Sequence, residues 1–329
     1  MKKKVPQFWH YFFPLIITLM MVAGVGMLTG KNARGFSLSK IRSSLEFNEE
    51  WVVDAPSNEI MEEIRDILGQ EFHYLGNGTQ CYAFLSKDGE YVLKFFKMKH
   101  LMPKNWLRFF PIPGLGQYRF NKTEGRIARR KQIFTSHKMA YKYLREETGL
   151  IFVHLNKTRD LGVTTALCDR FGQKLQVRPD QLEFILQRKA TPITEHIDKL
   201  MKTGRVDEAK SSIRTLLRHV VNKSKRGFLD KDFNPSHNYG FVGNQIIHYD
   251  VGQIVQDDDA VKPSHYLREV LRVSTNLEQW LAINYPELLP TLEEDVGEWI
   301  DQEQPSVTIR SSADDEDGAS GNDADADKR

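Results

Sequence analysis

The stretch that decides the fold is Gly227–Gly252, which reads GFLDKDFNPSHNYGFVGNQIIHYDVG. Two short apolar runs flank a Gly243-Asn244 turn, so this stretch predicts a β-hairpin. Antiparallel strands would bring Asn238 and Asp250 to the same end of that hairpin. There an amide oxygen and a carboxylate can share one Mg²⁺ with substrate phosphates. The stretch therefore predicts a metal and phosphate site.

The same stretch resembles the catalytic segment of the protein-kinase-like superfamily. That family has a catalytic loop with an Asp, a Pro and then an Asn, and an Asp-Phe-Gly element after the following hairpin. Here Asp232, Pro235 and Asn238 are followed by Asp250-Val251-Gly252. The looser Asp-x-x-Pro and Asp-hydrophobic-Gly forms are typical of atypical kinases that phosphorylate sugars, antibiotics, lipids or lipopolysaccharide cores. These atypical members are the nearer match.

The resemblance implies a role for each residue of this segment. Asn238 and Asp250 would bind Mg²⁺, and Asp232 would orient or deprotonate an acceptor hydroxyl. Asp230 is a rival for the base, although Pro235 aligns better with Asp232. The family usually has its Asn five residues after the catalytic Asp, a position that is His237 here. Either the loop carries a one-residue insertion, or His237 faces the metal site.

The upstream half shows a matching glycine-rich loop. Gly76 and Gly78 stand between two predicted strands, and glycines let backbone amides approach phosphate oxygens closely. Lys94 follows on the next strand, eighteen residues after Gly76. The resemblance implies that Gly76, Gly78 and Lys94 hold the phosphates of ATP. The third glycine of the family is replaced by Cys81.

A basic and aromatic segment follows Lys94. From Lys94 to Arg145 there are fourteen Lys or Arg residues against one acid, Glu124. Aromatic residues are interleaved with the charges, most densely in an insert at about 97–122. We expect this insert to face an anionic lipid or glycolipid surface rather than nucleic acid. The alternative is that its basic face is merely solvated.

The pattern after Asn121 predicts a helix that extends to about Glu147. In the kinase-like family the corresponding regulatory helix donates a Glu to the strand Lys. Because Glu124 is the only acid near the start of this helix, the resemblance assigns that role to Glu124.

The N-terminus predicts a membrane anchor at residues 1–35. Three Lys residues precede a run from Val5 to Gly30 that contains no Asp, Glu, Lys or Arg, which is long enough to span a bilayer. A cleaved signal peptide is the alternative. Basic residues on both sides of the run nearly cancel as orientation signals. We expect the following domain in the cytoplasm, because an ATP-dependent enzyme needs a cytosolic site.

The resemblance implies an α+β, two-lobed protein-kinase-like fold. Residues 36–190 would form an N-lobe with an antiparallel sheet of about five strands, and residues 191–303 a mostly helical C-lobe. The acidic tail, residues 304–329, is expected to be disordered. Only two cysteines occur, which argues against a disulfide framework or a structural zinc.

The function expected from these features is membrane-anchored phosphoryl transfer from ATP, with Mg²⁺, to the hydroxyl of a lipid, glycolipid or other small molecule. Protein acceptors are disfavoured, because only about a dozen residues separate Gly252 from the next helical pattern and no Ala-Pro-Glu-like element is present. Two alternatives stay open. One is a pseudokinase that acts as a binding scaffold, and the other is a non-enzymatic membrane or envelope protein.

Overall fold

The computed structural model describes residues 36–103, 116–232 and 238–303. The predicted anchor and acidic tail lie outside these residues, as do parts of the basic insert and of the catalytic loop. No helix in the described ranges is both long and apolar enough to cross a membrane.

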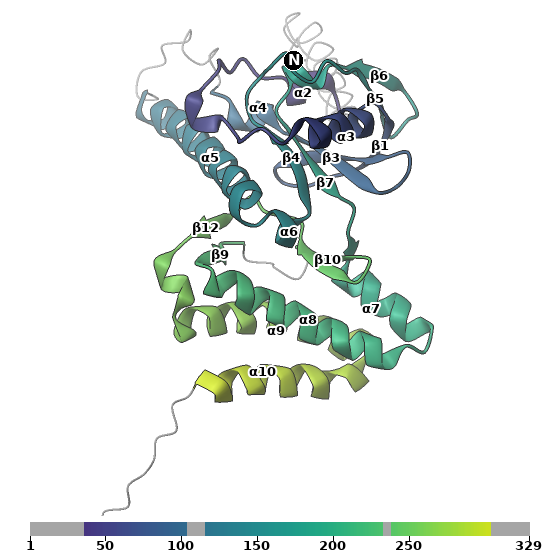
Figure 1. Ribbon diagram of the computed structural model, residues 1–329. Coiled ribbons are helices and arrows are strands. Elements are labelled where there is room, and N and C mark those ends of the chain that lie inside the picture. The colour runs from purple at the N-terminus through teal and green to yellow at the C-terminus, as the bar shows by residue number, and fades with distance from the viewer. Residues whose placement is uncertain (1–35, 104–115, 233–237, 304–329) are drawn as a thin grey trace, which may run out of the picture.

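The N-lobe is built on one seven-stranded sheet (Figure 1). Its strand order is β4-β7-β3-β2-β1-β5-β6, and neighbouring strands are antiparallel except for β1 and β5, which are parallel. The strands are β1 (Glu71–Asn77), β2 (Cys81–Ser86), β3 (Tyr91–Phe96), β4 (Leu150–His154), β5 (Thr165–Cys168), β6 (Lys174–Val177) and β7 (Phe184–Arg188). The sheet exceeds the expected five strands partly because β6, with the sequence KLQV, is too short and polar to be recognised from its pattern.

Helices cover both faces of this sheet. On one face lies α3 (Asn58–Leu68), whose Ile64 and Leu68 are buried against Phe72 and Phe84 of the sheet. On the other face lie the short α4 (Met98–Leu101) and the long α5 (Gly116–Tyr143). A four-residue α2 (Leu38–Ile41) completes the first layer. Helices therefore pack on both faces of the sheet, although side chains of β1 and β6 remain exposed.

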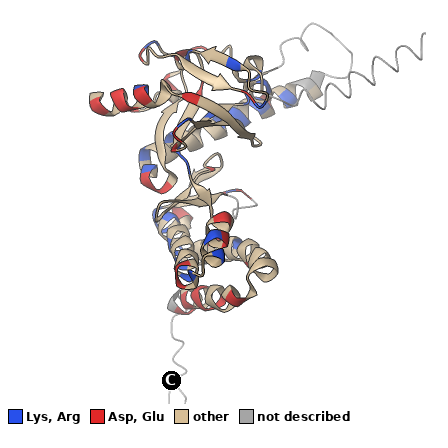
Figure 2. Cartoon of the chain, turned by 90° about the vertical axis from the view of Figure 1, so that its right-hand side faces the viewer, with Lys and Arg blue, Asp and Glu red and all other residues tan. Residues whose placement is uncertain are grey.

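Helix α5 starts before the start predicted from the sequence, near Asn121, and stops before the predicted end, near Glu147. It spans Gly116–Tyr143, and the separate α6 (Arg145–Thr148) follows. Gly149 then adopts a left-handed conformation with φ of 63°, which ends α6. Lys and Arg residues recur along α5 (Figure 2). Several of them are bonded to the N-lobe, since Arg126 donates to the Met102 carbonyl and Lys131 pairs with Glu50 at 2.9 Å.

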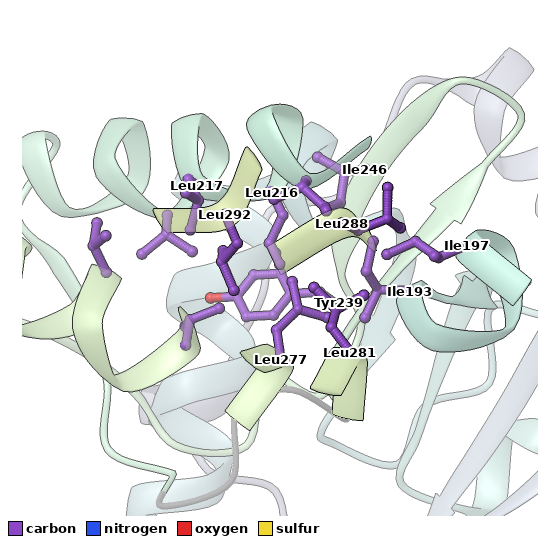
Figure 3. Close-up of a cluster of buried hydrophobic side chains, with 14 of the residues drawn as sticks. Ile193, Ile197, Leu216, Leu217, Tyr239, Ile246, Leu277, Leu281, Leu288 and Leu292 are labelled. Atoms are coloured by element: carbon purple, nitrogen blue, oxygen red, sulfur yellow. The ribbon is translucent and has the colours of Figure 1, made fainter. Parts of the chain in front are cut away.

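The C-lobe is mostly helical, as predicted. It contains α7 (Ile193–Lys202), α8 (Val206–Lys225), α9 (Pro263–Asn284) and α10 (Leu289–Glu303). Its core gathers side chains from all four helices around the Tyr239 ring, with Leu277 and Leu281 beside it (Figure 3). The buried residues of α8 recur at helical spacing along one face.

The predicted hairpin is present and packs onto α7 and α8. It consists of β10 (Tyr239–Val242) and β11 (Gln245–His248), joined through Gly243 at φ of 58°. The short β8 (Thr191–Pro192) pairs with β10. A second small sheet joins β9 (Phe228–Asp230) to β12 (Ile254–Gln256). These two small sheets hold the two ends of the segment between Asp230 and Tyr239, which contains Asp232.

Several contacts connect α5 and α6 with the C-lobe. The Ser136 hydroxyl on α5 donates to the carbonyl of Val251, which lies in the Asp250-Val251-Gly252 element. Arg226, at the end of α8, pairs with Glu147 on α6. The position of α5 is thereby tied to the loop that carries Asp250.

Candidate active site

A cavity of about 350 Å³ lies between the sheet of the N-lobe and the end of the hairpin. Its apolar walls come from Ala83, Val92, Leu150 and Ile185. The end of β7 and the two residues after it, Gln187–Ala190, line one side of the cavity. A partly open apolar slot of this kind is suited to a flat heteroaromatic ring.

Lys94 and Asp250 lie together in this cavity. The Lys94 ammonium donates to the Tyr249 carbonyl at 2.7 Å. Burial lowers the pKa of Lys94, and the nearby Asp250 carboxylate opposes that shift. Asp250 is exposed, and within the described ranges no residue forms a hydrogen bond or ion pair with its carboxylate. The two predicted residues are therefore brought together, with the carboxylate oxygens accessible.

A second cavity, of about 500 Å³, adjoins the first through Thr79, Gln80 and Asp250. Asp232 lines it from the C-lobe, and α5 supplies the facing wall. The α5 residues on that wall are Gly125, Ala128, Arg129, Gln132 and Ile133. Asp250 therefore stands where the nucleotide-sized cavity meets a larger space that also contains Asp232.

Asn238 lies at the start of the hairpin, opposite the chain that leads to Asp250. Its backbone carbonyl accepts from the Tyr249 amide at 2.8 Å. Its side-chain amide donates to Asp232 at 3.1 Å and to Asp230 at 3.3 Å. The hairpin thus brings Asn238 and Asp250 to the same end, the geometry expected from the sequence.

Asp230 is buried, and each of its carboxylate oxygens has a polar partner. Its Oδ1 accepts from the Asp232 amide at 2.9 Å, and its Oδ2 lies 3.1 Å from Nε2 of His248. Burial alone would raise the pKa of Asp230, but His248, Lys223 and the Asp232 amide outweigh it and hold that pKa below its usual range. A carboxylate held in this way has little basicity. The geometry therefore favours Asp232, which lines the cavity, over Asp230 as the base.

A buried cluster of polar side chains packs around Asp230. The Lys223 ammonium donates to the Tyr239 hydroxyl at 2.9 Å, and the Tyr239 ring stacks on His248 with centroids 4.6 Å apart. Burial acts to lower the pKa of Lys223, but Tyr239 and Asp230 outweigh it and raise that pKa. Arg272 donates to the Asp230 carbonyl and pairs with Glu269 at 2.7 Å. These groups fix the loop without entering either cavity.

Of the two glycines expected in a loop between strands, Gly78 lies in the turn between β1 and β2, whereas Gly76 lies within β1 and pairs with Ala83. The Gly78 amide donates to the Cys81 carbonyl at 3.0 Å, and Gly78 lines the first cavity whereas Gly76 does not. A methyl group at either glycine would meet nothing within 4 Å, so packing within the protein does not require these glycines. Burial raises the pKa of the Cys81 thiol to about 12, which excludes it as a nucleophile at neutral pH.

Glu124 is not brought to Lys94. It is exposed, lines neither of the two cavities, and lies thirteen residues before His137, the α5 residue that lines the first cavity. At about 1.5 Å per residue this separation is about 20 Å along the helix. A pairing between Glu124 and Lys94 is therefore absent from this structure.

The donor set at the hairpin end fits Mg²⁺. Asn238 and Asp250 offer oxygen ligands, with Asp232 beside them, and hard cations such as Mg²⁺ prefer carboxylate and amide oxygens. The accessible Asp250 carboxylate suits a cation that retains water ligands. His237 lies outside the described residues, so its expected alternative role stays open.

Sequence reasoning missed two residues that line the cavities. His137 gave no signal because a lone His in a helix is usually a core residue. Gln80 reaches from the glycine-rich loop over Gly252, where a methyl group would lie 2.0 Å from the Gln80 carbonyl oxygen. A side chain at position 252 would therefore have to displace the end of the Gln80 side chain. This contact could not be seen without the fold.

Comparison with known proteins gives structural neighbours only. No protein-family model matches the chain, and no curated protein matches it. Among solved structures, it is similar to WbdD bound to the kinase inhibitor LY294002, at 14% identity and a TM-score of 0.31. That match covers 67% of this chain and 44% of the other. The bifunctional kinase-methyltransferase WbdD matches at 14% identity and a TM-score of 0.30, over 71% of this chain and 45% of that one.

A streptomycin-ATP-APH(2")-IIa ternary complex matches at 13% identity and a TM-score of 0.29, over 76% of this chain and 93% of the other. The chain spans less than half the length of the WbdD chains it matches. The α+β organisation predicted from the sequence is confirmed, with a sheet-based N-terminal part and a helical C-terminal part.

Proposed function

We propose that this chain is an ATP-dependent phosphotransferase that moves a phosphoryl group to the hydroxyl of a small molecule, lipid or glycolipid. The observation that carries the proposal is the position of Asp250, which lines both cavities, with Lys94 in the first and Asp232 in the second. Phosphoryl transfer needs mainly positioning and charge neutralisation, and these groups supply both.

Each residue has one role in the proposed reaction. The apolar slot would hold the adenine, while Lys94 and the Gly78 region would hold the phosphates. Asn238 and Asp250 would hold Mg²⁺, which neutralises charge on the phosphoryl group when bound. The acceptor hydroxyl would enter from the second cavity and pass its proton to Asp232 as its oxygen bonds to phosphorus. The bond from phosphorus to the ADP oxygen breaks in the same transfer.

The test is a thermal-shift titration of the full chain with ATP and Mg²⁺, which compares wild type with Asp250→Ala. We expect a Mg²⁺-dependent rise in melting temperature that Asp250→Ala abolishes. Asp258→Ala is the matched control, because Asp258 is exposed and lines neither cavity. A folded wild-type protein with no nucleotide-dependent shift would remove the proposal.

The acceptor class includes lipids and glycolipids because of two segments, one before the N-lobe and one within it. The apolar run at residues 5–30 and the basic, aromatic insert would hold the second cavity near an anionic membrane surface. In this proposal the catalytic domain lies on the cytoplasmic side, where ATP is available. A topology reporter fused after Arg329 tests the orientation, and an external C-terminus would contradict it.

A second candidate is a pseudokinase scaffold. It is favoured by one observation: within the described ranges no carboxylate of α5 pairs with Lys94, and the predicted partner Glu124 lies far along the helix. Tight MgATP binding without detectable transfer or hydrolysis would select this candidate over the phosphotransferase.

A further inference from the structure

Lys94 has no carboxylate ion pair in the part of the chain that the structure describes. Its one hydrogen bond goes to the Tyr249 carbonyl, at 2.7 Å. An ammonium group has three donors, so two remain for other partners. Of the α5 residues, only His137 is among the described residues that line the cavity with Lys94.

The His137 ring is held in a defined orientation. Its Nδ1 lies 2.7 Å from the Ile133 carbonyl, one turn earlier in the same helix. A carbonyl can only accept, so Nδ1 carries the proton. Phe96 meets the ring edge-on with centroids 5.2 Å apart, and His137 is only 4% exposed. The ring is therefore fixed with Nδ1 toward its own helix.

This orientation determines whether the other ring nitrogen, Nε2, acts as a hydrogen-bond donor or as an acceptor. Burial lowers the pKa of His137 to about 4, so the ring is neutral at pH 7 and Nε2 is an acceptor. An acceptor cannot pair with phosphate oxygens, which are also acceptors, and an imidazole nitrogen is a poor ligand for Mg²⁺. The complementary group in this cavity is an N–H donor, and Lys94 supplies one.

We propose that His137 is the positioning residue for Lys94 in the nucleotide-bound protein, where Nε2 would accept from an ammonium that, among the described residues of this structure, bonds only to the Tyr249 carbonyl. His137 would orient the ammonium without neutralising it, because the imidazole carries no charge. The third ammonium donor is then directed to the nucleotide phosphates with its full positive charge. This assignment rests on the proposed nucleotide site, although the ring's tautomer can be measured without nucleotide.

The first test is the tautomer of His137 in the free protein. Long-range ¹H–¹⁵N NMR of the full chain at pH 7 distinguishes a protonated Nδ1 from a protonated Nε2, with His137→Gln used to assign the signals. We expect the proton on Nδ1. A proton on Nε2 would overturn the proposal whatever the nucleotide experiments give.

The second test separates positioning from packing. His137→Leu keeps the bulk but removes the acceptor, and His137→Gln keeps a polar acceptor. We expect His137→Leu to weaken MgATP binding about tenfold, the order expected for loss of one hydrogen bond to a charged group. His137→Gln should restore most of that loss. Adenosine, which has no phosphates, should bind all three proteins equally.

The matched control is His154, which is also buried and whose Nδ1 also lies near a carbonyl, that of Leu182, at 2.8 Å. It lines neither cavity, so His154→Leu should lower the melting temperature and leave MgATP affinity unchanged. If wild type binds MgATP and His137→Leu binds it equally well, the role of His137 is wrong while the nucleotide site stands. If wild type binds no MgATP, both the nucleotide site and the role of His137 are overturned.

Discussion

At the residue scale, substitutions of Asp230 and Asp232 should have different effects. One should mainly lower the stability of the fold, and the other should mainly slow phosphoryl transfer. Asp232 lines the second cavity, so Asp232→Asn should leave the fold and MgATP affinity nearly intact. It should slow transfer by about 100- to 10,000-fold, the usual contribution of a general base. The measurement is the rate of MgATP turnover, with water as acceptor until the natural acceptor is known.

Asp230→Asn should give the opposite pattern. Asp230 is 1% exposed and lies against His248, with the buried Lys223 nearby, so its loss leaves positive groups without their counter-charge. Breaking a buried charge pair costs about 3 to 5 kcal/mol. Chemical denaturation of the two variants checks this. A stable but inactive Asp230→Asn, beside an active Asp232→Asn, would reverse the assignment of the base.

Single residues also show which parts of the site could be predicted from the sequence and which could not. Asn238 and Asp250 could be placed together because a two-residue turn fixes the register of the hairpin. Glu124 was chosen because it is the only acid between Lys94 and Arg145. The same scarcity of acids agrees with the absence of a carboxylate partner for Lys94 among the described residues of α5. Which α5 residue faces the cavity depends on where the helix packs, and local sequence does not encode this.

At the element scale, one methyl group added at Gly240 should disrupt the pairing of β8 with β10. A side chain at Gly240 would lie 2.5 Å from the Thr191 carbonyl, so the two strands could not keep their spacing. Gly240→Ala should destabilise the protein by about 1 to 3 kcal/mol, as overpacking does. It should also weaken MgATP binding, because Asn238 lies two residues away at the start of the same hairpin.

The control for this prediction is Gly76→Ala on β1, where an added methyl meets nothing within 4 Å. Denaturant unfolding should show a clear loss for Gly240→Ala and little change for Gly76→Ala. Equal stability of the two variants would mean that β8 does not hold the hairpin.

Elements differ in how far the sequence determines them. The bounds of α8 follow from its own apolar face, because the period of a long amphipathic helix is visible locally. The β9 and β12 strands are three residues each and pair across 24 residues of chain, as in the match of Asp230 with Ile254. Strands this short carry no periodic signal, so their pairing could be known only from the fold.

At the scale of the whole molecule, buried histidines should make the folded state sensitive to acid. Burial lowers the pKa of His137 to about 4, while burial and the neighbouring Lys223 and His248 lower that of His219 to about 3. In the unfolded chain both should titrate near 6.5. Below that pH the unfolded state binds more protons, so stability falls with decreasing pH. The contribution is complete above about pH 6.5 and is lost progressively as the pH falls toward the folded values.

The size of the effect can be isolated with His219, which lies on α8 away from both cavities. One pKa unit corresponds to about 1.4 kcal/mol, so acidification from pH 7 to pH 5 should cost about 2 kcal/mol through His219 alone. Urea unfolding at both pH values gives the free-energy difference for wild type and for His219→Gln. The variant should be less stable at pH 7 because a buried ring is replaced, yet its loss between pH 7 and pH 5 should be smaller by about 2 kcal/mol. An equal loss in both proteins would mean that His219 is protonated in the folded state as readily as in the unfolded one, contrary to its burial beneath Tyr239.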